Sequence, residues 1–173
     1  MPSPPSEPVA PAKPPLEMRF KLKDGREALV RRADPGDGKG LWTFMKEAGL
    51  AIGVPSYSEH LCKTATDEHL WLARAPANDA FVALVGGRIV GISSFGPETH
   101  ELSPPKDPAF LQSNGVDPAD VCVGHMAVLH EMQALGVGTA LKKVQVLGAE
   151  RAGYVGVVSD TYGEPIRAIV RKL

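Results

Sequence analysis

Residues 121–159 have the sequence VCVGHMAVLHEMQALGVGTALKKVQVLGAERAGYVGVVS, and this stretch decides the fold. Residues 121–129 are apolar and rich in β-branched side chains, which predicts a strand. Residues 139–152 repeat apolar side chains at helical spacing, and Gly153 follows as a helix stop. A loop with two glycines, residues 133–138, joins the two elements. The predicted order is strand, glycine loop, helix and strand.

The glycine loop, Gln133-Ala134-Leu135-Gly136-Val137-Gly138, opens the predicted helix. The start of a helix leaves backbone N–H groups unpaired and carries the positive end of the helix dipole. Glycine lets an anion approach those N–H groups closely. The loop therefore predicts a phosphate or pyrophosphate site. Lys142 and Lys143, further along the helix, could add positive charge near the phosphates, and the favoured expectation is a solvated helix face.

The loop resembles the Gln/Arg-x-x-Gly-x-Gly/Ala motif of the GCN5-related N-acetyltransferases (the GNAT family). In that family the loop cradles the pyrophosphate of acetyl-coenzyme A (acetyl-CoA), and the backbone of the preceding strand binds the pantetheine arm. The resemblance implies acetyl-CoA as co-substrate and a set of residues that bind it. These are Met126, Ala127 and Val128 of the strand, and Gln133, Leu135, Gly136, Val137, Gly138 and Thr139 of the loop and helix start.

One alternative is an NAD(P)-binding oxidoreductase domain with the fingerprint G-x-G-x-x-G. In that fingerprint the first glycine directly follows the strand, and an acidic residue lies about 20 residues further on. Asp160 meets the second requirement, but six residues separate Leu129 from Gly136, and Leu141 occupies the place of the third glycine. The spacing favours the acetyltransferase. A non-catalytic acyl-CoA-binding module is a further alternative.

The segments before the glycine loop occur in the order found in the same family. The resemblance implies an α/β fold with a mixed, mainly antiparallel central sheet flanked by helices. The predicted segments are a strand over residues 26–32, a turn over 34–38, a helix near 41–50, a helix from a capping box at Ser56, and a hairpin of strands 80–85 and 88–94 around Gly86-Gly87.

The chain is expected to hold one folded domain. Its 173 residues are 43% hydrophobic, which suffices for one core. Residues 1–17 are expected to be a disordered proline-rich leader, and residues 18–173 the N-acetyltransferase domain. The long link over residues 95–120 is expected to be irregular, and either to shape the acceptor site or to be a mobile surface insertion. The strands that usually close the family's sheet are missing after Leu173, which indicates either a fragment or completion by a partner chain.

Acetyl transfer to an amine needs a base that makes the amine neutral and an acid for the leaving thiolate. The family often has a glutamate base eleven residues before the loop glutamine, and here that residue is Cys122. His125 is the candidate base, because its ordinary pKa lies near neutral pH; an isolated histidine on an apolar strand is otherwise a core residue. Glu131 and Asp120 flank the strand, and either could serve as a base through water. Tyr162 is the candidate acid, and the alternative for it is a surface tyrosine beside a helix start.

The composition of the chain limits the classes of binding partner and the location that are expected. The formal net charge of −1 argues against nucleic-acid binding. No run of 18 apolar residues occurs, so neither membrane binding nor export is expected, and the predicted location is cytoplasmic. Cys62 and Cys122 are far apart, which predicts neither a disulfide nor a metal site. The expected partners are an amine acceptor, either a small molecule or a protein, and a second copy of the chain in a homodimer.

Overall fold

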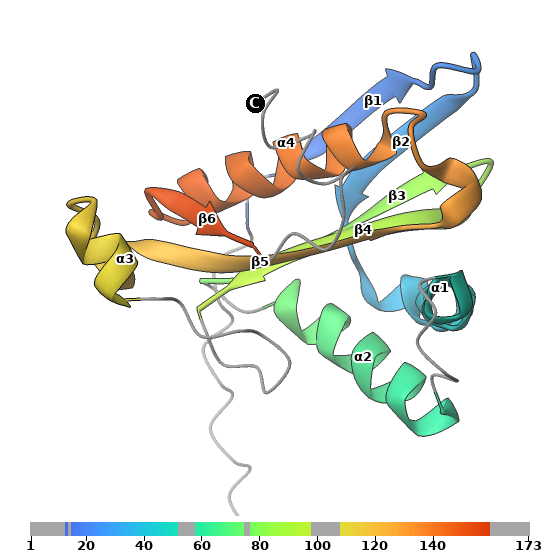
Figure 1. Ribbon diagram of the computed structural model, residues 1–173. Coiled ribbons are helices and arrows are strands. Elements are labelled where there is room, and N and C mark those ends of the chain that lie inside the picture. The colour runs from blue at the N-terminus through green and yellow to red at the C-terminus, as the bar shows by residue number, and fades with distance from the viewer. Residues whose placement is uncertain (1–12, 14, 52–57, 75–76, 98–107, 160–173) are drawn as a thin grey trace, which may run out of the picture.

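The computed structural model describes residues 13, 15–51, 58–74, 77–97 and 108–159. They form a six-stranded sheet in the order β1-β2-β3-β4-β5-β6 (Figure 1). Neighbouring strands from β1 to β5 are antiparallel, and β6 is parallel to β5. The strands are β1 (Glu17–Lys21), β2 (Glu27–Arg32), β3 (Asp79–Val85), β4 (Arg88–Gly96), β5 (Val121–Val128) and β6 (Gly156–Val158). The predicted mixed, mainly antiparallel sheet is confirmed.

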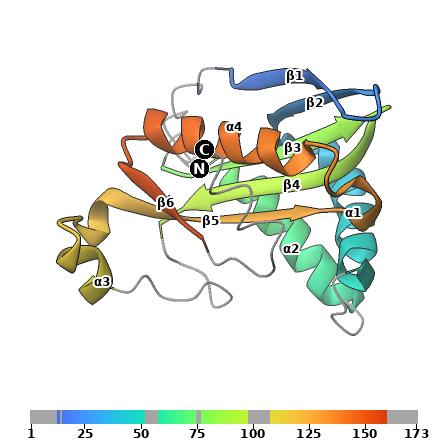
Figure 2. The ribbon, with the colours of Figure 1, turned by 45° about the horizontal axis from the view of Figure 1, so that its top comes forward.

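Helices cover both faces of this sheet. α1 and α2 lie against one face and α4 against the other, as both ribbon views show (Figures 1 and 2). α3 is short and lies beside the first residues of β5. The helices are α1 (Gly38–Ala51), α2 (Glu59–Leu72), α3 (Pro108–Ser113) and α4 (Val137–Arg151), with 3-10 turns at Pro35–Asp37, Pro118–Asp120 and His130–Met132.

The core lies between the sheet and α4 on one face, and between the sheet and α1 and α2 on the other. Phe44 of α1, Phe81 of β3 and Phe95 of β4 are its largest fully buried side chains. Each such side chain contributes about 1.5–3 kcal/mol by leaving water. Gly148 of α4 allows the helix to lie close to the sheet, because a Cβ there would come within 2.8 Å of the Phe95 ring.

The β3–β4 hairpin confirms the sequence prediction. Gly86 and Gly87 have φ angles of +56° and +79°, the left-handed conformations that a tight two-residue turn requires at both central positions. The segment predicted as the first strand is also present, but it is β2, the second strand in the chain.

The boundary between leader and domain lies earlier than the sequence predicts. Leu16 is buried, and Glu17 already begins β1, so the domain does not start at residue 18. The Lys13 ammonium donates to the Asn78 carbonyl and lies 3.7 Å from an Asp79 carboxylate oxygen. One apolar side chain and one lysine give too little pattern to mark these contacts in the sequence. Residues 1–12 and 14 lie outside the described part of the chain, and their disorder stays a prediction.

Two other boundaries differ from prediction. The N-cap of α2 is Ser58, whose Oγ accepts from the Leu61 N–H at 3.3 Å, whereas Ser56 lies outside the described residues. The link over residues 95–120 is not wholly irregular, because it contains α3 and a 3-10 turn. Its residues 98–107 lie outside the description, as do residues 160–173, on which the predicted closing helix falls.

We expect His69 to make the fold sensitive to acid. His69 is buried at the end of α2, where its Nε2 lies 3.2 Å from the Phe81 carbonyl oxygen, and burial lowers its pKa to about 4. The folded state therefore holds this ring neutral, while the unfolded state takes up a proton below about pH 6.5. The contribution of His69 to the free energy of unfolding is therefore fully present above about pH 6.5. That free energy falls by about 3 kcal/mol as the pH drops to about 4.

Urea unfolding at several pH values between 7.5 and 4 measures this loss. The matched variant is His69→Gln, which keeps a donor for the Phe81 carbonyl but does not titrate. It should show a smaller loss over the same range than the unmodified chain. Equal losses in the two proteins would contradict the assignment of the acid sensitivity to His69.

Candidate functional site

The glycine loop follows β5 and carries two left-handed residues close together. Ala134 has a φ angle of +62° and Gly136 one of +105°. Such alternation turns successive backbone N–H groups toward one side, as in anion-binding nests. A left-handed alanine costs about 1–2 kcal/mol, and strain of this kind clusters at ligand sites. The loop geometry therefore agrees with the predicted anion site, which stays a prediction.

The start of α4 leaves backbone donors unused. Gly136 is the N-cap and makes no side-chain capping bond, and the first helical bond runs from the Ala140 N–H to the Gly136 carbonyl at 3.1 Å. Within the described part of the chain, no N–H group of residues 135–139 donates to a backbone carbonyl. These are the donors that the sequence predicts. They coincide with the positive end of the α4 dipole.

Contacts from behind hold the loop in place. The Lys23 N–H, in the turn between β1 and β2, donates to the Leu135 carbonyl at 3.2 Å. Met132 is buried, and the Val137 side chain is fully buried against the sheet. The loop is thus anchored through a carbonyl and two apolar side chains. None of these described contacts uses the N–H groups of residues 135–139.

The two sides of β5 differ along its length. β4 pairs with it from Val123 through Val128. On the other side β6 pairs only with Val121, Cys122 and Val123, so among the described residues no strand pairs with the rest of β5 on that side. We call the space beside residues 124–128 of β5 the β5–β6 opening. It contains the predicted backbone of Met126, Ala127 and Val128 and lies on the path to the glycine loop.

Gln145 and Lys142 of α4 lie beneath the β5–β6 opening. The Gln145 side chain is fully buried, and its Nε2 donates to the Ser94 carbonyl at 2.8 Å and to the His125 carbonyl at 3.0 Å. Ser94 and His125 are partners across β4 and β5. The Lys142 Nζ donates to Gln145 Oε1 at 2.8 Å. Gln145 therefore fixes the backbone of β5 where the opening begins.

The two neighbouring lysines behave differently. The prediction of a solvated face is correct for Lys143 and wrong for Lys142, which is only 8% exposed. Gln145 was missed altogether, although it lies four residues after Leu141 and so on the apolar helical face. A polar residue on that face was the signal that could have identified it.

The catalytic candidates are brought together only in part. The His125 side chain is exposed on β5 at the opening, so the alternative of a core histidine does not hold. Cys122 is fully buried, and its Sγ lies 3.6 Å from the Gly156 carbonyl oxygen, as expected for a small buried side chain. Glu131 is exposed and lies 3.1 Å from an Arg88 nitrogen. Tyr162 lies outside the described residues.

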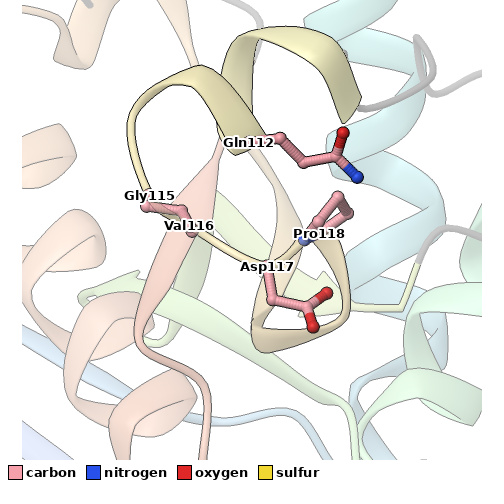
Figure 3. Close-up of a pocket in the computed structure, with 5 residues that line it drawn as sticks. All are labelled: Gln112, Gly115, Val116, Asp117 and Pro118. Carbon is pink, nitrogen blue, oxygen red and sulfur yellow. The ribbon is translucent and has the colours of Figure 1, made fainter.

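Two surface hollows lie away from the glycine loop. One of about 310 Å³ lies between the end of α3 and the start of β5, lined by Gln112, Gly115, Val116, Asp117 and Pro118 (Figure 3). It belongs to the link that was expected to shape the acceptor site, and that role stays a prediction. A second hollow of about 530 Å³ lies between α1 and α2. No helix of the described chain has the length and apolar character needed to cross a membrane.

Comparison with known proteins gives a fold. No protein-family model and no curated protein matches the sequence. The GNAT domain of S. lividans PAT matches with a TM-score of 0.67 and 16% identity over 91% of this chain and 86% of that domain. An N-acetyltransferase from Staphylococcus aureus Mu50 gives 0.59 and 16% over 84% and 81%.

A third solved structure is similar to the chain in the same way. It is an aminoglycoside N-acetyltransferase in complex with CoA, with a TM-score of 0.54 and 18% identity over 86% of this chain and 84% of that one. At sequence identities this low, the structural match establishes a shared architecture and nothing beyond it. The chain has the fold of the GNAT acetyltransferases.

Proposed function

We propose that the chain binds acetyl-CoA and transfers the acetyl group directly to a primary amine of a small molecule or a protein. One observation carries the proposal: within the described residues, the N–H groups of residues 135–139 donate to no backbone carbonyl and follow the end of β5, and no described strand pairs with the β6 side of β5 at residues 124–128. A pyrophosphate fits the first feature and a chain of amides fits the second.

Each part of the site has a distinct task. The N–H groups from Leu135 to Thr139 bind the pyrophosphate, and the positive end of α4 favours its charge. The backbone of residues 126–128 bonds the amides of the pantetheine arm as an added strand would. Acetyl-CoA supplies an acetyl group activated as a thioester. Gln145 holds the His125 carbonyl and so sets the position of the β5 backbone against which that arm lies.

His125 is the residue that we propose as the base. Its side chain is exposed and projects from the strand that borders the opening. An amine with a pKa near that of lysine is mostly protonated at neutral pH, and only the neutral form is nucleophilic. A histidine can take that proton directly or through a water molecule.

The position of Leu141 argues against a dinucleotide site. In the dinucleotide fingerprint a glycine at this place lets the helix approach its strand. Here Leu141 is fully buried, and the glycine lies on the opposite side of the contact, because a Cβ on Gly91 would come within 2.8 Å of Leu141 Cδ1. The close approach of helix and sheet is therefore built in another way.

A non-catalytic acyl-CoA-binding module is the second candidate. The observation that favours it is Cys122, which is fully buried at the place where relatives often have a glutamate base. Backbone groups would still bind the ligand in that case, because their donors do not depend on the missing side chain.

Release of CoA from acetyl-CoA in the presence of a panel of primary amines separates the two candidates. We expect at least one amine to raise the rate of thiol release above the hydrolysis rate, with an equal amount of acetylated amine formed. The chain with Gly136→Asp serves as the matched control for background reaction. Tight binding of acetyl-CoA without amine-dependent release, across cationic and neutral amines and peptide amines, would refute transfer and support the binding module.

A further inference from the structure

Lys142 is a buried ammonium group without a charged partner in the described structure. Its Nζ donates to Gln145 Oε1 at 2.8 Å and to Ser159 Oγ at 3.1 Å, and both acceptors are neutral. Among the ion pairs between described residues, none includes Lys142. Burying a charge without a counter-ion is costly. The fold therefore keeps a cation where packing alone favours an apolar side chain.

The ammonium contacts residues that border the β5–β6 opening. Val158 is the last residue of β6 that pairs with β5, and it pairs with Val123. Ser159 directly follows Val158. Through Gln145 the ammonium is linked to the carbonyl of His125. His125 pairs with β4 but with no described strand on the β6 side. The Lys142 ammonium thus bonds to Gln145 of α4 and to the residue that directly follows β6, close to where β5 and β6 cease to pair.

Gly124 makes room for this arrangement. A Cβ at this position would come within 2.6 Å of Gln145 Nε2 and 2.5 Å of Val157 Cγ1. Any larger residue would push the Gln145 amide away from β5 and with it the group that accepts from Lys142. The buried cation is therefore held by a fitted set of contacts.

We propose that Lys142 is a catalytic residue that places its ammonium against the thioester sulfur and stabilises the thiolate as it leaves. The inference rests on the proposed function, because it takes the end of the pantetheine arm to lie in the β5–β6 opening. The acceptor nitrogen forms a bond to the acetyl carbon, and the carbon–sulfur bond breaks with its electron pair going to sulfur. The nitrogen gives up its extra proton to the base, and the thiolate takes up a proton from water on release.

The location makes this interaction stronger after bond cleavage than before. The thioester sulfur is neutral, whereas the thiolate supplies a counter-ion that no described side chain provides in an ion pair with Lys142. An interaction that grows as charge develops lowers the barrier, and in a site shielded from water it does so most effectively. Burial lowers the pKa of Lys142, and the coulombic interaction with the nearby Cys122 side chain acts in the opposite direction. The negative charge of a ligand thiolate would likewise favour the charged form of Lys142.

The titration of two side chains, Cys122 beside this ammonium and Tyr154 beside Cys122, must be separated from that of the ligand thiol. Cys122 of β5 interacts electrostatically with Lys142 and also with Tyr154, which lies in the turn after α4. Both absorb in the ultraviolet when they ionise. The difference between a complex with CoA and a complex with desulfo-CoA, which lacks only the thiol, isolates the ligand thiol from both.

The test is the pKa of the CoA thiol in the complex, followed by the ultraviolet absorbance of the thiolate. In the unmodified chain we expect the bound thiol to ionise about 1–3 pH units below free CoA, as an opposite charge within about 4–6 Å produces. Lys142→Met, which fills the same buried space without a charge, should lose this shift. Lys143→Met, at the exposed neighbouring position, should retain it. Calorimetry should show that CoA binds the unmodified chain more tightly than desulfo-CoA does, and that this preference disappears in Lys142→Met.

The outcomes distinguish the inference from the function on which it rests. Equal thiol pKa values in the unmodified chain and in Lys142→Met, with CoA bound to both, would overturn the role of Lys142 and leave CoA binding intact. Failure of the unmodified chain to bind CoA would overturn both. Should Lys142→Met not fold, Lys142→Gln provides a neutral hydrogen-bonding replacement for the same comparison.

Discussion

Gly136→Asp should abolish the binding of acetyl-CoA while the domain stays folded. Gly136 precedes the first turn of α4, and a Cβ built there meets no atom within 4 Å, so the side chain has room. Its carboxylate would lie beside the N–H groups that the pyrophosphate needs. Two like charges about 4 Å apart repel by about 4 kcal/mol at an effective dielectric constant of about 20. That corresponds to about a thousandfold loss of affinity.

The matched control for this variant is Gly136→Asn. Asparagine has the same shape as aspartate and adopts the left-handed φ of +105° more readily than most residues do, but it carries no charge. It should retain much more of the affinity than the aspartate variant. Calorimetric titration with acetyl-CoA measures all three proteins, and circular dichroism confirms their folding. Unchanged affinity in a folded Gly136→Asp protein would refute the position of the site.

Gly124→Val should destabilise the domain by about 3 kcal/mol. Even the first atom of the new side chain would come within 2.5 Å of Val157 Cγ1 and 2.6 Å of Gln145 Nε2. Gln145 cannot move aside without giving up its bonds to the Ser94 and His125 carbonyls. Forcing extra atoms into a packed core costs about 1–3 kcal/mol, and the lost hydrogen bonds add to that.

Gly156→Val is the control for strand position. Gly156 lies in β6 beside the same strand, but a Cβ there would be 3.7 Å from Val121 Cγ1, an ordinary contact. Urea unfolding of the two variants and the unmodified chain measures the free energies of unfolding. We expect a much larger loss for Gly124→Val than for Gly156→Val. Similar losses at both positions would show that Gly124 is not needed for close packing.

The sequence predicts the fold best where local chemistry decides the structure. Gly86-Gly87 specifies a tight turn because two adjacent residues must adopt positive φ, and the flanking apolar strands then pair by default. The glycine loop and α4 are likewise encoded within about 20 neighbouring residues by periodicity and helix-start signals. These elements lie where they are predicted, within a few residues at each end.

Features that depend on distant contacts could not be predicted in this way. β1 is a five-residue edge strand with alternating exposed and half-buried residues, and its place beside β2 comes from pairing across a turn. The burial of Lys142 depends on where β6 ends relative to α4, which no local pattern specifies. The bridge from Gln145 to two strands depends on sheet register in the same way.

In the candidate site, backbone groups can be placed from the sequence, whereas the roles of side chains cannot. Donors in the backbone of residues 135–139 follow from the helix start alone, so the sequence suffices to place them. Side-chain roles depend on how β5 and β6 separate, and so His125 stays a proposal. Tyr162, which lies beyond the described residues, stays a prediction. The sequence predicts a solvated Lys142 because adjacent lysines on a helix usually form an exposed face, whereas its burial comes from residues that are close only in space.

Isothermal titration of the unmodified chain with acetyl-CoA and, separately, with NAD tests the central claim most directly. The backbone donors of the glycine loop and the edge of β5 that no described strand covers predict saturable binding of acetyl-CoA at one site. They predict much weaker binding of NAD, which has no pantetheine arm whose amides could bond to the β5 backbone. Binding of NAD as tight as that of acetyl-CoA, or no heat of binding with acetyl-CoA at any concentration up to the millimolar range, would contradict it.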